Sequence, residues 1–114
     1  MTEQQQTLGS VVKLATWQPQ LIPLSEQERA WIRQVAVEAV FSAWNTRGRP
    51  TDLREIFAFY VERCKAEGVQ IRKKRTVDRR VNEAASTEYG ARIVSNTAGM
   101  YQPNPTLFLE EKQP

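Results

Sequence analysis

Apolar side chains recur every three or four positions between residues 25 and 47, which is the period of one face of an amphipathic helix. The motif SEQE at the start of this segment is a capping-box pattern, in which Ser25 caps the helix and Glu28 reaches back to its backbone N–H. Gly48 and Pro50 favour a helix end just before them. The predicted core stripe consists of Trp31, Ile32, Val35, Ala36, Ala39, Val40, Ala43 and Trp44.

A second stripe with the same period predicts a second helix, which ends at Gly68. Thr51 or Asp52 can cap this helix, and Asp52 with Glu55 repeats the capping-box pattern. Cys64 continues the stripe, so we expect it to be a small core residue rather than a reactive thiol. The stripe consists of Leu53, Ile56, Phe57, Tyr60, Val61 and Cys64.

The third periodic segment is also the most basic part of the chain. Six of the sixteen Lys and Arg residues lie in the nine positions of RKKRTVDRR, residues 72–80. Val77, Val81 and an alanine at 84 or 85 follow at helical spacing, which predicts a helix from about Lys74 to Ser86 with one narrow apolar face. The opposite surface is expected to carry Arg75, Arg79, Asn82 and Glu83, with Thr76 and Arg80 at its flanks.

The period changes from helix to strand after Tyr89-Gly90, where the helix is expected to break. The run ARIVSNTAGMYQP predicts a β-hairpin with strands at 92–94 and 100–102, and Asn and Gly residues between them suit the positive φ angles of a turn. Pro103 and Pro105 are expected to end the sheet because proline has no N–H to donate.

These elements divide the chain into an N-terminal arm (1–23), a mainly α domain with a small β-hairpin (24–103) and a C-terminal tail (104–114). The arm contains more apolar residues than a purely disordered segment needs, so it either lies on the core or forms a dimer contact. The LFL segment of the tail either packs on the body of the protein or docks elsewhere.

Composition narrows the function. The 114 residues are enough for one compact domain, and the single Cys is typical of a reduced compartment. The absence of His removes the commonest general base and metal ligand, and the five glycines form no phosphate-binding loop. We therefore expect no enzymatic activity, no cofactor and no metal. No apolar run approaches the ~18 residues of a membrane span, and the start MTEQQQ is unlike a signal peptide, so we expect a soluble cytoplasmic protein.

The positive charge is concentrated in the middle of the chain. Residues 47–92 carry twelve basic and seven acidic side chains, a net charge of +5, whereas the segments before and after them each carry −1. A localised excess of this kind favours an anionic partner such as nucleic acid, although a merely solvated charged face remains open.

The order of three helices and a hairpin resembles a winged helix-turn-helix DNA-binding domain over residues 25–103. The run KRTVDRRV is similar to the start of a recognition helix, and IVSNTAGMY is similar to a wing, with Gly99 shortly before Tyr101. Residues 49–51 are expected to supply the small extra strand of such domains. The resemblance implies a three-helix winged helix-turn-helix with extended N- and C-terminal arms.

The resemblance also implies a mode of DNA binding, with helix 74–86 in the major groove and hairpin 91–102 as the wing. Residues expected to read bases are Arg75, Thr76, Arg79, Arg80 and Asn82. Residues expected to contact phosphates are Arg47, Arg49, Thr51, Arg72, Lys73, Lys74, Arg92, Asn96 and Thr97. Some residues in both sets have an alternative role within the protein. Arg79 or Arg80 can pair with Glu83 or another acidic side chain, and Asn96 can serve only to form the turn.

The leading hypothesis is a sequence-specific double-stranded DNA-binding protein, a transcription or replication regulator of phage or plasmid type. A single module reads few base pairs, so a homodimer or cooperative array bound to DNA, and hence to the nucleoid, is expected. The alternative is a winged-helix adaptor that binds an acidic protein and no DNA. Single-stranded nucleic acid ranks third, because few aromatic residues accompany the basic stretch.

Overall fold

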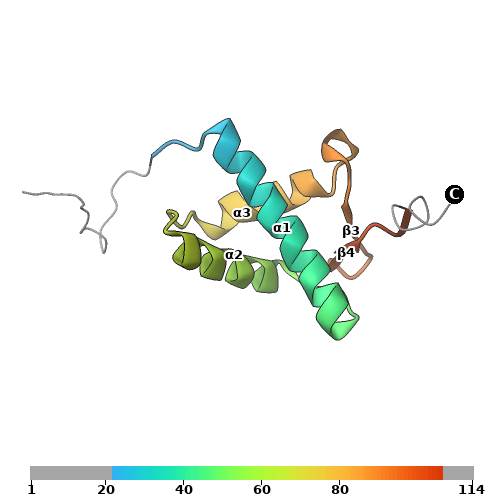
Figure 1. Ribbon diagram of the computed structural model, residues 1–114. Coiled ribbons are helices and arrows are strands. Elements are labelled where there is room, and N and C mark those ends of the chain that lie inside the picture. Colours follow the sequence, from blue (N-terminus) through green and yellow to red (C-terminus); the bar gives the residue numbers. More distant parts are fainter. Residues whose placement is uncertain (1–21, 107–114) are drawn as a thin grey trace, which may run out of the picture.

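The computed structural model describes residues 22–106, which fold into three helices and a two-stranded antiparallel hairpin (Figure 1). This confirms the expected fold class, mainly α with a small β-hairpin, and the layout is compatible with a winged helix. Most of the N-terminal arm and the LFL segment of the tail lie outside the described residues. The elements in chain order are α1 (Glu26–Arg47), α2 (Leu53–Glu67), α3 (Lys74–Ala84), a short 3₁₀ turn η1 (Thr87–Tyr89), β3 (Ile93–Ser95) and β4 (Tyr101–Pro103).

The first two helices begin and end where their capping residues predict. Ser25 Oγ accepts a hydrogen bond from the backbone N–H of Glu28 at 3.0 Å, and Asp52 Oδ1 accepts one from Glu55 at 2.8 Å. Gly48, with a φ of 65°, ends α1 in the left-handed region that glycine enters without strain. The second hydrogen bond of each predicted capping box, from the backbone N–H of the cap residue to the Glu carboxylate, is wrong. The carboxylates of Glu28 and Glu55 accept hydrogen bonds from other side chains instead.

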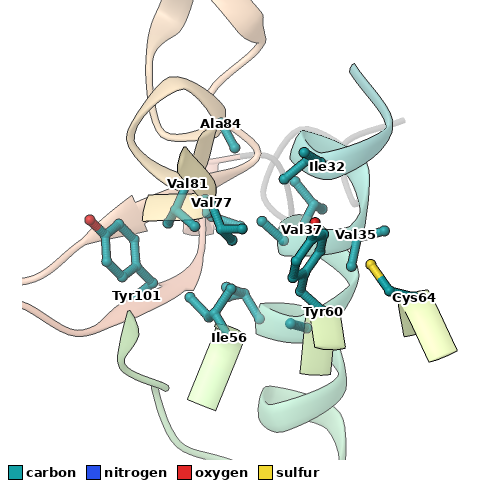
Figure 2. Packing of buried hydrophobic residues seen from close by; sticks show 14 residues of the cluster. Ile32, Val35, Val37, Ile56, Tyr60, Cys64, Val77, Val81, Ala84 and Tyr101 are labelled. Carbon is teal, nitrogen blue, oxygen red and sulfur yellow. The ribbon is translucent and has the colours of Figure 1, made fainter. Parts of the chain in front are cut away.

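α1 crosses both other helices, and the core lies where the three meet (Figure 1). Figure 2 shows side chains from α1, α2 and α3 converging around Tyr60, while Tyr101 enters from the hairpin. Burying one Val or Ile side chain contributes about 1.5–3 kcal/mol, so this cluster supplies the main attraction between the elements. Its largest fully buried members are Tyr60, Ile32, Ile56, Ile93, Val35, Val40, Val77 and Val81.

α3 ends at Ala84, two residues before the expected end at Ser86. The Ser86 hydroxyl accepts a hydrogen bond from the backbone N–H of Glu88 at 3.1 Å and so caps the following turn η1. Serine competes with helical hydrogen bonding in this way and favours caps over helix interiors. The chain then leaves η1 through Gly90.

Each strand of the hairpin lies one residue further along the chain than expected. Ile93 pairs with Pro103 and Ser95 with Tyr101, so β4 includes Pro103 and ends with it. The backbone N–H of Asn104 still donates to Arg92 O at 2.9 Å. Ile93–Pro103 is thus a pair without mutual hydrogen bonds, where the ladder needs no proline N–H.

A third chain segment joins the hairpin at its edge, as expected for residues 49–51. Thr51 forms an isolated antiparallel bridge with Tyr101, with backbone hydrogen bonds of 2.9 and 2.7 Å in the two directions. The start of α2 is thereby fixed to β4, which is the second strand of the hairpin.

Candidate nucleic-acid interface

α3 has one buried and one exposed side, and the exposed side carries most of the residues expected to read bases. Val77, Val81 and Ala84 are buried and pack towards α1. Arg75, Arg79 and Asn82 recur three or four positions apart and are exposed. We call these three residues the outer face of α3.

The cations of this surface differ in whether they have an acidic partner. Among residues 22–106, no carboxylate lies within ion-pair distance of Lys73, Arg75 or Arg79, all of which are exposed. Lys74 is paired with Asp78 at 2.9 Å. We call Lys73, Arg75 and Arg79 the free cations of α3.

The sequence predicts an exposed Arg72 ahead of α3, but this residue is buried. It is 6 % exposed, and its guanidinium forms two hydrogen bonds to the Glu28 carboxylate, at 2.7 and 2.8 Å. Its side chain also donates to the carbonyl of Ile22, and its backbone N–H donates to the Tyr60 hydroxyl at 2.8 Å. The pKa of Arg72 is raised, first by the hydrogen bonds to Glu28. Arg72 therefore ties the chain before α3 to α1 and α2, which corrects its assignment to the phosphate-binding surface.

Arg80 is also buried, at 5 % exposed, and pairs with Glu83 at 2.9 Å. Position 80 follows Val77 by three residues and precedes Ala84 by four, so it faces the same side of the helix as the apolar stripe. Arg33 of α1 binds the same Glu83 at 2.8 Å. The expectation that Arg80 stands at the base-reading surface is corrected, and its alternative, a pair with Glu83, is what the structure contains.

Asn82 is the third exposed residue of the outer face, and it contacts the hairpin. Its Oδ1 accepts a hydrogen bond from the Tyr101 hydroxyl at 2.8 Å. Burial raises the pKa of Tyr101, and the charge of Asp78 adds to the rise, so the hydroxyl stays protonated and able to donate at neutral pH. No local pattern in the sequence predicts this bond, because its partners are 19 positions apart. Thr76, also expected to read bases, is half-buried at the flank of the helix.

The three residues near the start of α2 that are expected to contact phosphate all lie close to Glu55. Thr51 is 2 % exposed and its hydroxyl donates to the Glu55 carboxylate, so its expected contact with phosphate is corrected. Arg47 and Arg49 are exposed, with guanidinium nitrogens 3.5 and 3.9 Å from Glu55 Oε2. Exposed pairs of this length are weak, so both arginines remain available to an anion.

The three hairpin residues expected to contact phosphate differ in their surroundings. Arg92 lies at the base of the hairpin, with its guanidinium 5.5 Å from the ring centre of Phe41. Asn96 accepts hydrogen bonds from the backbone N–H groups of Ala98 and Met100 at 2.9 and 3.0 Å, so it forms the turn. Thr97 is exposed at the tip.

The part of the chain that the structure describes holds no cluster of three or more Cys, Asp or Glu side chains that would suit a metal ion. Between residues 22 and 106, no helix combines the length and apolar character needed to cross a membrane. Compared with known proteins, the chain matches no protein-family model, no curated protein and no solved structure.

Proposed function

We propose that this protein binds double-stranded DNA in a sequence-specific way, with α3 in the major groove. The observation that carries the proposal is the group of free cations, which lie along the exposed face of a helix whose other face is fixed to the core. Unpaired cations on a rigid helix repel one another in the free protein, and a polyanion relieves that repulsion.

The outer face suits base reading. Arg75 and Arg79 are one helical turn apart, and each guanidinium can donate two hydrogen bonds to guanine O6 and N7. Lys73 lies at the cap position before α3, where a cation meets backbone phosphate rather than bases. Lys74, Arg47, Arg49, Arg92 and Thr97 remain as candidates for further phosphate contacts, without information on sequence.

A monomer with this small reading face distinguishes few base pairs, since each good bidentate contact contributes about 1–3 kcal/mol of discrimination. We therefore propose that the protein acts as a homodimer or a cooperative array on repeated half-sites, as a transcription or replication regulator.

The test is selection from a randomised duplex library at about 150 mM salt, a concentration at which phosphate contacts alone are weak. Enrichment of a motif supports the proposal, and a repeated or palindromic motif gives the spacing between protomers. Retention without a motif contradicts sequence-specific binding. No retention by the folded protein favours the adaptor alternative.

The selection needs a variant that removes one free cation and a control of equal charge change. Arg79→Ala removes a cation of the outer face. Arg29→Ala removes a cation from α1, the helix that packs on the opposite side of α3. Arg29 is exposed and its guanidinium lies 3.5 Å from the Glu26 carboxylate, so this variant leaves the outer face intact.

A further inference from the structure

The hydrogen bond between α3 and the hairpin determines which atoms Asn82 presents to DNA. The donor, Tyr101, is held in place because it is 6 % exposed and its ring belongs to the core cluster. Its backbone is bonded to Thr51 in both directions. Figure 2 shows its hydroxyl at the edge of the cluster, directed away from the core side chains. The oxygen of the Asn82 amide is thereby bonded to a fixed donor at 2.8 Å.

The nitrogen of the same amide has no such partner. No described residue accepts a hydrogen bond from Asn82 Nδ2. Asp78, one turn earlier, bonds to Lys74 through Oδ2, and its other oxygen takes no hydrogen bond from this part of the chain. Asn82 is exposed, so it offers two N–H donors to the surroundings while its acceptor faces Tyr101.

We propose that Tyr101 is a positioning residue that holds the Asn82 oxygen towards the hairpin, so that Asn82 meets the base edge through its N–H donors. This inference rests on the proposed function. An unrestrained Asn binds adenine through two bonds, accepting from N6 and donating to N7. The bond from Tyr101 takes one lone pair of Oδ1 and turns this oxygen towards the hairpin, so the amide presents its two N–H donors outward. Its partner is then an acceptor such as purine N7, which adenine and guanine share. Asn82 thus discriminates against cytosine, which presents only a donor, and does not favour adenine over guanine.

Removal of the tyrosine hydroxyl should change this preference in a defined direction. In Tyr101→Phe the ring still fills its place in the core, but Asn82 Oδ1 becomes free to accept from adenine N6. We expect adenine to be enriched over guanine by about five-fold or more at the base pair that Asn82 contacts, which corresponds to one bidentate pair.

The experiment is selection from the randomised library with the wild type and three variants. Asn82→Ala identifies the base pair that Asn82 contacts, because preference is lost at that position. Tyr101→Phe tests the positioning role. Tyr89→Phe is the matched control, since Tyr89 is exposed, packs its ring on Arg33 at 4.1 Å and makes no hydrogen bond through its hydroxyl within the described residues. It should select the wild-type motif.

Two results overturn the inference while leaving DNA binding established. The first is a wild-type preference for adenine over guanine at the position that Asn82→Ala identifies, which requires no variant of Tyr101. The second is an unchanged preference in Tyr101→Phe with the helical circular dichroism of the wild type. A wild type that enriches no motif overturns this inference together with the proposed function.

Discussion

Arg72 and Arg79 belong to one basic stretch of nine residues, yet the structure surrounds them in opposite ways. Arg72 is 6 % exposed, and the Nε and Nη2 atoms of its guanidinium both donate to the Glu28 carboxylate. Arg79 is exposed and has no acidic partner among residues 22–106. The basic stretch therefore contains two populations of cations, those that are buried and paired like Arg72 and those that are exposed and unpaired like Arg79. Only the exposed, unpaired cations have charge available to a polyanion.

The two populations act on different free energies. The transfer of Arg72 from water to the interior is unfavourable, and its bonds to Glu28 offset that loss, so its contribution is to the free energy of unfolding. The mutual repulsion of the free cations opposes folding slightly and is relieved when an anion binds. Stability and DNA affinity should consequently respond to different substitutions within the same stretch.

The largest expected effect comes from breaking the buried pair. Glu28→Ala leaves the Arg72 guanidinium buried without its carboxylate, and we expect the free energy of unfolding to fall by about 3 kcal/mol. Urea denaturation followed by circular dichroism measures this loss. Glu26→Ala is the matched control, because Glu26 is an acid in the same first turn of α1 but is exposed and paired on the surface. A similar loss in both variants would mean that helix charge, rather than the buried pair, is responsible.

The next effect is on DNA binding by the free cations. We expect Arg79→Ala to weaken binding to the preferred duplex by about 1–3 kcal/mol and to relax its sequence preference, because one bidentate base contact is lost. Its stability should change by less than about 0.5 kcal/mol, as at other exposed positions. Fluorescence anisotropy with the preferred and a random duplex measures the difference. Equal weakening on both duplexes would exclude Arg79 as a base reader.

A smaller and uniform effect is expected from Lys73→Ala. A lysine at the cap position meets phosphate, so all duplexes should be weakened similarly and the slope of log K against log salt should fall by about one. Lys74→Ala sharpens the comparison, because Lys74 is already paired with Asp78 and should change the slope less. Affinities at four or five salt concentrations give both slopes. A larger change for Lys74 would show that the pair with Asp78 opens on DNA.

The sequence predicted what depends on neighbours along the chain and missed what depends on distant ones. The ends of α1 and α2 followed from local caps, and the burial of Arg80 was implicit in the spacing that places it with Val77 and Ala84. The partner of Arg72 is Glu28, 44 positions away, and the partner of Asn82 is Tyr101, 19 positions away. Such pairs form only once the helices have packed, so no local pattern encodes them.

The smallest effect concerns a cation between the two extremes. Arg63 of α2 pairs with Glu38 of α1 at 2.7 Å, and both side chains are partly exposed. The pKa of Glu38 is lowered, first by the hydrogen bond from Arg63 and then by that from Gln34.

Because the carboxyl has a lower pKa in the folded state, its stabilisation is present above the unfolded value of 4.5 and is lost as the pH falls through the folded value. Glu38→Gln should therefore lower stability by about 0.5 kcal/mol near neutral pH, and the difference from the wild type should be smaller at about pH 3. Thermal denaturation at both pH values measures it. A difference that is equally large in acid would assign the loss to packing between α1 and α2 rather than to the ion pair of Arg63 with Glu38.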